Sequence, residues 1–312
     1  IYNKTQFYSN IIIYNRKEKI MKILVFDIGG TAIKYGICQS GKLLSINECP
    51  TEAYKGGPHI LQTICSLAEH SLPFDAIGIS TAGQVNPQEG SIIYANSNIP
   101  NYTGTQFQKI LQERFHVPVA VENDVNSAAL GEAIFGAGKG NHSFLCLTYG
   151  TGIGGAIIEN GKIYHGSSFS AGEFGAITTH AEEKLTSTDP FDGCYERYAS
   201  ATALIKMVSS VDSSLTNGRQ IFANLERPEI KTVVNKWIDE IVLGLATLIH
   251  IFNPSCIILG GGIMVQPYIL KQIHTRIPQM IMSSFTHVEI FSAQLGNSAG
   301  LLGAYYLASQ KL

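Results

Sequence analysis

Carboxylates, amides and hydroxyls stand beside glycine-rich turns at three points of the 312-residue chain. The stretch DIGGTAIK contains Asp27, the stretch GTGIGG begins at Gly150, and the stretch VENDVNSAALGE carries Asn123 and Asp124. Glycines let backbone N–H groups approach an anion closely, and a neighbouring threonine adds a hydroxyl donor. These residue types suit the binding of phosphate groups close to a carboxylate.

The first glycine stretch places Asp27 before the turn and Lys34 after it. An aspartate at a strand end beside phosphates can hold Mg²⁺ directly or through water, and a lysine can neutralise the β- and γ-phosphates. The alternatives are a turn-initiating cap for Asp27 and a solvated strand residue for Lys34. One glycine loop alone is more often a simple β-turn, but two equivalent loops favour phosphate binding.

The second glycine stretch matches the dinucleotide pattern G-x-G-x-x-G at positions 150, 152 and 155. That pattern requires a helix after the loop, with an acidic residue about 20 positions further on. Glu173 lies at about that distance, but it does not end a second predicted strand. The sequence AIIENGKIY after the loop has strand character and an Asn-Gly turn. We therefore reject a dehydrogenase.

The two glycine stretches belong to segments 24–44 and 145–164, which align with a shift of 120 residues. Each segment predicts a strand, a glycine-rich turn, a second strand, a tight Ser-Gly or Asn-Gly turn and a further strand. The period is far too long for a solenoid. The repeat therefore predicts two related domains.

The segments after each repeat alternate between strand and helix patterns. Residues 75–80 and 118–123 predict short buried strands, and residues 231–252 have apolar side chains at helical spacing, ended by Asn253-Pro254. The sequence CIILGGG predicts a strand running into a glycine turn, and the segment from 297 predicts a helix. We expect an α/β fold with antiparallel edges on otherwise parallel sheets.

The acidic and amide cluster at 122–126 ends the predicted strand 118–123. The carboxyl end of a strand in an α/β sheet is a usual ligand address, and one carboxylate can act as general base. The alternative is that Asp124 or Asn126 only caps the helix that follows.

The bulk composition excludes several functional classes. A net charge of −2 gives no basic face for nucleic acid, and no stretch of about 18 apolar residues predicts a membrane span. Six cysteines without a C-x-x-C pair indicate buried thiols in a reducing cytoplasm. Residues 1–20 differ from the rest, and we expect a non-native or disordered leader with Met21 as the natural start.

Eight stretches occur in the order seen in the ROK family of sugar kinases and sugar-responsive repressors. They are DIGGTAIK, STAG, ENDVNSAALGE, LTYGTGIGGAIIENGKI, AGEFG, GCYERYAS, IILGGGI and AGLLGA. The chain resembles that family over residues 22–310. The resemblance implies the actin-like, ribonuclease-H-like pair of domains with a cleft between them. We place the boundaries at 21–135, with helix 297–312 packing back on this domain, and at 136–296.

The resemblance also implies the roles of individual residues. It makes Asp124 the base for the C6 hydroxyl of a hexose, with ATP and Mg²⁺ bound by the glycine loops and with Asp27 facing the metal. The expected sugar contacts are Gly83, Asn98, Asn123, Glu173 and Glu196. The expected ATP contacts are Asp27, Gly29, Gly30, Thr31, Lys34, Thr151, Gly152, Gly154, Gly260, Gly261 and Gly262.

The chain departs from the family pattern where many members bind zinc. Ala176 stands at the position of a family histidine, and the following stretch holds only His180 and Cys194 as candidate ligands. Two ligands do not complete a tetrahedral site, so we expect no zinc. Ala176 leaves room beside C1 or C2 of the sugar, and the stretch 80–107 is most similar to N-acetylmannosamine kinases. Glucokinase and β-glucoside kinase remain alternatives.

Two other functions of the family are less favoured. A repressor would need a DNA-binding domain before DIGGT, and we expect twenty-odd residues to be too few for one. A non-catalytic sugar sensor would need broken phosphate loops or a missing base, and all of these are present. We expect a cytoplasmic homodimeric kinase that binds sugar and ATP, without nucleic acid or membrane partners.

Overall fold

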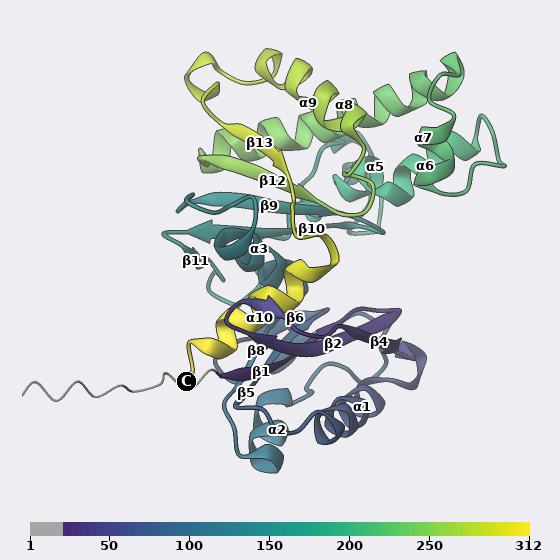
Figure 1. Ribbon diagram of the computed structural model, residues 1–312. Helices are drawn as coiled ribbons and strands as arrows, with labels where there is room; N and C mark the ends of the chain where they lie inside the picture. The colour runs from purple at the N-terminus through teal and green to yellow at the C-terminus, as the bar shows by residue number, and fades with distance from the viewer. Residues whose placement is uncertain (1–20) are drawn as a thin grey trace, which may run out of the picture.

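The computed structural model describes residues 21–312. The expectations for residues 1–20 and for Met21 as natural start depend on residues outside this range. Two separate sheets stand one above the other, and helices α3 (Asp124–Phe135) and α10 (Ala299–Ser309) lie between them (Figure 1). This arrangement places residues from both sheets around a common space.

The N-terminal sheet has the strand order β3-β2-β1-β5-β8, with β4 paired to β2. Strands β1, β5 and β8 are parallel and β2 to β4 run antiparallel, so the expected mixture of directions is confirmed. Helices α1 and α2 lie on its outer face (Figure 1). The elements of this part are β1 (Lys22–Ile28), β2 (Ala32–Gln39), β3 (Lys42–Leu43), β4 (Asn47–Pro50), α1 (Gly57–His70), β5 (Ala76–Thr81), β6 (Gln84–Asn86), β7 (Ser91–Tyr94), α2 (Phe107–Phe115) and β8 (Val119–Asn123).

The second sheet repeats this plan with the order β11-β10-β9-β12-β13. Helix α8 covers its outer face, and its apolar side, centred on the fully buried Trp237, forms the largest core of the molecule. The elements are β9 (Phe144–Tyr149), β10 (Ile153–Glu159), β11 (Lys162–Ile163), α4 (Ala181–Thr186), α5 (Glu196–Ala199), α6 (Ala201–Ser209), α7 (Gly218–Ala223), α8 (Pro228–Phe252), β12 (Cys256–Gly260), α9 (Pro267–Arg276) and β13 (Glu289–Ser292).

The two predicted hairpins are confirmed, and they share backbone geometry. The turn Ser40-Gly41 has φ angles of 49° and 74°, and the turn Asn160-Gly161 has 51° and 74°. Two successive residues with positive φ make the type I′ turn that matches the twist of paired strands. The strand after GTGIGG, β10, also confirms that this loop does not open a helix.

Helices α3 and α10 pack against each other through glycines. A Cβ added to Gly303 would lie 1.8 Å from the Ser127 carbonyl oxygen, and one on Gly131 would lie 2.3 Å from that of Ala299. Such distances leave no room for any side chain. Beneath them, α10 seats Leu301 and Leu302 against Ile23 and Val25 of β1. Helix α10 therefore covers one face of the first sheet.

The chain crosses between the sheets next to one buried carboxylate, Glu132 of α3. Its Oε2 accepts from the Ala137 amide at 2.8 Å, and its Oε1 accepts from the amides of Gln294 and Leu295 at 2.9 and 2.8 Å. Residues 137 and 294–295 belong to the two connections between the sheets. Glu132 therefore holds both connections between the sheets against helix α3.

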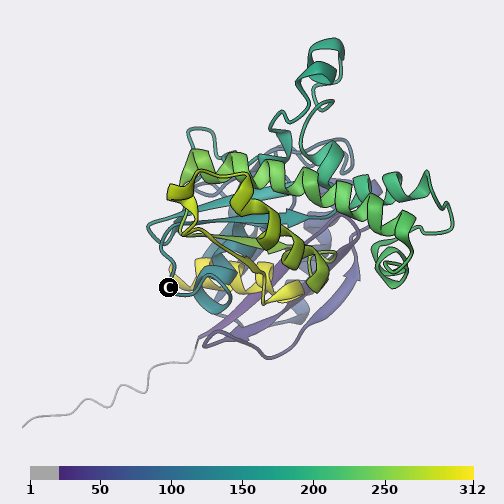
Figure 2. The same cartoon turned by 90° about the horizontal axis from the view of Figure 1, so that it is seen from above.

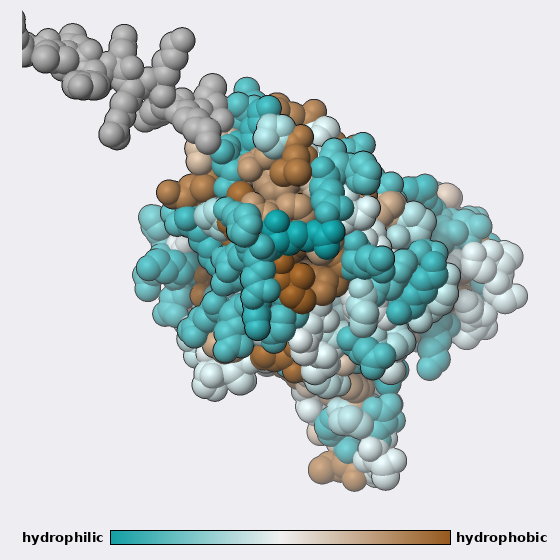
Figure 3. Space-filling view, turned by 90° about the horizontal axis from the view of Figure 1, so that it is seen from below, coloured by the Kyte–Doolittle hydropathy of each residue, from teal (hydrophilic) through white to brown (hydrophobic). Residues whose placement is uncertain are grey.

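The segment around α4 projects from the body in the views from above and below (Figures 2 and 3). Leu185 in this segment is 86% exposed, while Cys194 at its base is buried. In residues 21–312, no helix combines the length and apolar character needed to cross a bilayer.

Candidate active site

A cavity of about 720 Å³ is lined by residues of both sheets. It brings together the predicted base Asp124, the predicted sugar contacts Gly83, Asn123, Glu173 and Glu196, and much of the second glycine loop. From the predicted ATP set, the lining includes Thr151, Gly152, Gly154, Gly261 and Gly262. Residues separated by more than 170 positions in the sequence therefore share one space.

The strand end at 122–126 is organised by Asn123. Its Oδ1 accepts from the backbone amides of Val125 and Asn126 at 2.9 and 3.1 Å, so Asn123 is the N-cap of α3. The alternative that Asp124 or Asn126 provides the cap is wrong. Since the cap is supplied by its neighbour, the Asp124 carboxylate is left at the first helical position, facing the cavity.

The Asp124 carboxyl has an unusual protonation equilibrium. Burial, with a smaller contribution from the charge of Asp27, raises its pKa to about 6. Hydrogen bonds from the Val125 amide and the Asn123 side chain to Oδ1, at 3.0 and 2.9 Å, act in the opposite direction. A carboxylate with a pKa near 6 is a stronger base than an ordinary aspartate and is still ionised at pH 7.

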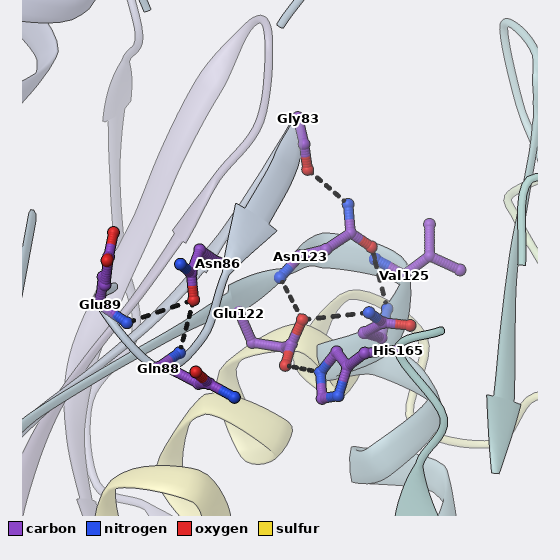
Figure 4. Close-up of polar contacts among 9 residues, drawn as sticks. Gly83, Asn86, Gln88, Glu89, Glu122, Asn123, Val125 and His165 are labelled. Carbon is purple, nitrogen blue, oxygen red and sulfur yellow. Dashed lines mark hydrogen bonds and ion pairs between the residues drawn. The ribbon is translucent and has the colours of Figure 1, made fainter. Parts of the chain in front are cut away.

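The residues predicted to contact the sugar are held by contacts across the cavity. The Asn123 Nδ2 donates to the Gly83 carbonyl at 2.9 Å, which joins β8 to the turn after β5 (Figure 4). Gln84 Nε2 donates to Glu173 Oε1 at 3.4 Å, and Glu196 Oε2 accepts from the Ile153 amide at 3.3 Å. Gly83 has φ +95°, a conformation that side chains with a Cβ rarely adopt.

The second glycine loop makes close contacts with the groups around Asp124. A Cβ on Gly152 would lie 2.6 Å from Glu196 Oε2, and one on Gly154 would lie 2.6 Å from Val125 Cγ2. Val125 follows Asp124 directly. The glycines here thus let the loop approach both the acid Glu196 and the N-terminus of α3.

The first glycine loop does not line the large cavity, but it is flanked by two charged residues, Asp27 and Lys34. Asp27 Oδ1 accepts from Ser80 Oγ at 2.7 Å, and Lys34 is its cross-strand partner in the β1–β2 ladder. Burial raises the pKa of Asp27, while Ser80 and Lys34 lower it. A Cβ on Gly300 would lie 2.8 Å from Asp27 Oδ1, so α10 approaches the carboxylate through bare backbone.

This donor set suits Mg²⁺ bound to phosphates. Mg²⁺ prefers oxygen ligands and usually takes one or two carboxylates together with substrate phosphates and water. Asp27 supplies one carboxylate, Gly30 and Thr31 are exposed in the turn beside it, and Lys34 supplies positive charge. Gly29 shapes the turn, since its amide donates to the Ala32 carbonyl and its carbonyl accepts from Thr51 Oγ1.

A second cavity of about 300 Å³ adjoins the first and shares Thr148, Gly261 and Gly262 with it. Gly260 lines this smaller cavity only. Gly261 has φ +101°, and a Cβ there would lie 2.2 Å from the Tyr149 carbonyl oxygen. Gly260, Gly261 and Gly262, the glycines predicted to lie near the adenosine, therefore border the smaller cavity, which adjoins the large one.

The structure does not bring Asn98 into the large cavity. Asn96 lines it instead, and Asn96 Oδ1 accepts from the Asn98 amide at 3.1 Å in an exposed turn. Sequence reasoning also missed an aromatic group at the cavity, Tyr94, Phe169 and Phe191, and the contacts of Glu122 with His165. Glu122 belongs to the motif VENDVNSAALGE, but its partner His165 lies 43 positions further along the chain, where no motif indicates the contact.

The region between Ala176 and Tyr198, where we expect no zinc, is held by a hydrogen bond and a ring contact. Cys194 Sγ donates to the Ala176 carbonyl at 3.2 Å, and His180 stacks on Tyr198 with ring centroids 3.6 Å apart. In residues 21–312, no three His, Cys, Asp or Glu side chains are grouped so that they could hold a metal ion. The expectation of a zinc-free protein remains a prediction.

Comparison with known proteins decides the family. The model of the ROK family matches residues 23–311. The chain belongs to the ROK family. Its α/β fold is the actin-like ATPase fold of the ROK sugar kinases, as expected.

The similar proteins include sugar kinases of more than one specificity. A β-glucoside kinase from Listeria innocua is 34% identical, with 92% of this chain and 97% of that protein aligned. A Listeria monocytogenes protein, named as a proposed N-acetylmannosamine kinase, has a TM-score of 0.84 at 30% identity, covering 93% and 99% of the two chains. A Streptomyces griseus ROK glucokinase, solved with glucose and AMPPNP, has 0.78 at 30% identity, covering 93% and 99%.

Proposed function

We propose that this ROK protein transfers the γ-phosphoryl group of ATP to the C6 hydroxyl of a hexose. The observation that carries the proposal is the cavity of about 720 Å³, in which Asp124 faces polar groups suited to a sugar and glycines suited to phosphates. The Streptomyces griseus ROK glucokinase, solved with glucose and AMPPNP, supports the same ligands. We further propose that the protein acts in the cytoplasm as a homodimer.

In this proposal Asp124 accepts the proton of the C6 hydroxyl as that oxygen attacks the γ-phosphorus, and the bond to the ADP oxygen breaks. The raised pKa makes the carboxylate an effective acceptor near neutral pH. Asn123, Glu173 and Glu196 orient the sugar hydroxyls, which places the attacking oxygen in line. Mg²⁺ beside Asp27 would neutralise charge on the transferred group.

We propose N-acetylmannosamine as the sugar. Ala176 lines the cavity, so its small side chain leaves room beside the sugar ring where a 2-acetamido group needs space. The Listeria monocytogenes protein proposed to act on the same sugar supports this assignment.

A β-glucoside is the second candidate. The aromatic side chains Tyr94, Phe169 and Phe191 line the same cavity, and aromatic rings suit contact with an aglycone or a second sugar ring. The similarity to a β-glucoside kinase supports this candidate, and glucose is the third, because glucokinases belong to the same group of relatives.

The deciding experiment measures ADP release with Mg·ATP and a panel of hexoses. The panel contains N-acetylmannosamine, N-acetylglucosamine, glucose, mannose, fructose and a β-glucoside. We expect the highest kcat/KM with N-acetylmannosamine and a fall of about 10²-fold or more in Asp124→Asn. Faster turnover of another hexose would reject the sugar assignment, and an unchanged rate in Asp124→Asn would reject the base.

A further inference from the structure

A buried carboxylate next to the base has contacts that the reaction above does not use. Glu122 is the penultimate residue of β8, is 1% exposed and precedes Asn123 and Asp124. Its Oε1 accepts from the Asn123 amide at 2.9 Å and from Asn126 Nδ2 at 3.0 Å. One carboxylate oxygen thus holds the residues on both sides of Asp124.

The other carboxylate oxygen of Glu122 contacts a residue that follows the second sheet. Its Oε2 lies 2.7 Å from Nε2 of His165, which follows β11 of the second sheet (Figure 4). The His165 side chain is 25% exposed, while Glu122 is buried. A buried carboxylate is costly to leave without donors, so this contact constrains where His165 lies.

His165 begins a loop, residues 165–171, that lines the large cavity near Glu173. Its carbonyl accepts from the Ala171 amide at 3.1 Å, which closes the loop, and its ring meets Phe169 edge to face at a centroid distance of 6.3 Å. Phe169, Ser170 and Ala171 line the large cavity. Glu173 follows two residues after the loop closes.

We infer that Glu122 and His165 form a positioning pair that fixes the loop 165–173 against the strand end carrying Asp124. The pair sets the separation between the base and the sugar contacts near Glu173, although neither residue needs to touch the reacting atoms. This inference rests on the kinase function proposed above. A misplacement of about 1 Å between reacting groups can cost about 10²-fold in rate.

The test measures steady-state kinetics of His165→Ala with the sugar that the wild type turns over best. We expect kcat/KM for the sugar to fall about 10- to 100-fold, through both kcat and sugar KM, with the KM for Mg·ATP changed less than about twofold. His165→Gln restores a donor at similar reach and is expected to recover most of the loss.

The pairwise origin of the effect is tested with Glu122→Ala. In the double variant Glu122→Ala/His165→Ala, the loss should be no larger than in Glu122→Ala alone, because the same contact is removed once. If Glu122→Ala does not fold, the His165 variants alone carry the test. His59→Ala is the matched control, since His59 pairs with Glu52 at 2.9 Å on the surface and neither residue lines either of the two cavities described above.

A purely structural role would give a different result. Melting temperature would fall in His165→Ala while kcat and sugar KM of the folded protein stayed at wild-type values, and this would overturn the inference. If the wild type turned over no hexose, the proposed function would fail instead. Sugar binding by calorimetry would then test the pair, with unchanged affinity in His165→Ala rejecting it.

Discussion

The two glycine hairpins share a backbone plan but differ in what they present to the space between the sheets. The penultimate pair of the β1–β2 ladder is Asp27 opposite Lys34, and the same place in the β9–β10 ladder holds Thr148 opposite Gly154. The first hairpin carries charges of both signs, and the second carries none at this place. The duplicated backbone thus carries a pair of opposite charges in one copy and a glycine that allows close approach in the other.

The largest expected effect comes from replacing Asp27 of the first hairpin by threonine, the residue type at the equivalent place, Thr148, of the second hairpin. In Asp27→Thr, we expect kcat to fall about 10²- to 10³-fold, because the carboxylate proposed to face Mg²⁺ is lost. The Mg²⁺ concentration for half-maximal rate should rise in titrations of the coupled assay. A normal circular dichroism spectrum would control for folding, and an unchanged Mg²⁺ dependence would remove Asp27 from the metal site.

The second hairpin is tested by filling the space that Gly154 leaves. In Gly154→Ala the new Cβ meets Val125 Cγ2, so we expect kcat/KM to fall about 10-fold and stability to fall by about 1–3 kcal/mol. Urea unfolding and the coupled assay measure the two effects. The control is Gly218→Ala, because Gly218 lines neither cavity and its added Cβ would meet only Ile263 side-chain atoms at 3.4 and 3.5 Å, an ordinary contact distance. Equal behaviour of both variants would contradict the close-approach role.

A smaller effect is expected when the first hairpin loses its cation. Lys34→Gly introduces the residue found at the equivalent place in the second hairpin and removes one charge near the phosphates. We expect KM for Mg·ATP to rise about 10-fold with little change in sugar KM, as for the loss of one charged hydrogen bond. A rise in sugar KM without a rise in the KM for Mg·ATP would contradict a role of Lys34 beside the phosphates.

The smallest expected effect is a shift in pH dependence. Because the Asp124 base must be ionised, kcat/KM should fall about tenfold per pH unit below its pKa of about 6. The charge of Asp27 contributes to the raised pKa, so the midpoint in Asp27→Thr should move to lower pH. Profiles of kcat/KM from pH 5 to 8 measure this shift, and an unmoved midpoint would show that the two carboxylates do not interact.

The same pKa has a consequence for stability, with the opposite sign to activity. A carboxyl whose pKa is higher in the folded state than its ordinary value of 3.8 makes folding less favourable once it ionises. This part of the stability is present below pH 4 and is lost as pH rises through about 6. Asp124→Asn should therefore be at least as stable as the wild type at pH 8 in urea unfolding.

The sequence predicted the elements whose patterns are local. The Ser-Gly and Asn-Gly turns specify the hairpins, and helix α8 starts at Pro228, three residues before its predicted start, and ends at the predicted Phe252. The β6–β7 hairpin was missed, because its short strands have an irregular register and no clear alternation. Local turn chemistry and hydrophobic period are properties of neighbours in the chain, so they can be recognised without a fold.

The candidate site was predicted where it coincides with motifs and was missed where it depends on distant contacts. Asp124, Glu173 and Glu196 meet in one cavity, although their roles remain proposals. Asn98 was predicted as a sugar contact, but Asn96 lines the cavity; the two lie in an exposed turn, where hydrophobic period does not specify which amide faces inward. The contact between Glu122 and His165 joins two sheets, and no pattern within either segment specifies it.

Helix α10 is the last helix of the chain, yet it covers the first sheet. Until the ribosome has released residues 299–309, the faces of β1 and β5 that receive Leu301 and Ala304 have no cover. N-terminal domains commonly fold first during synthesis. Here the first sheet must wait for the whole second sheet to be made, so a nascent chain carries an exposed apolar face that chaperones can recognise.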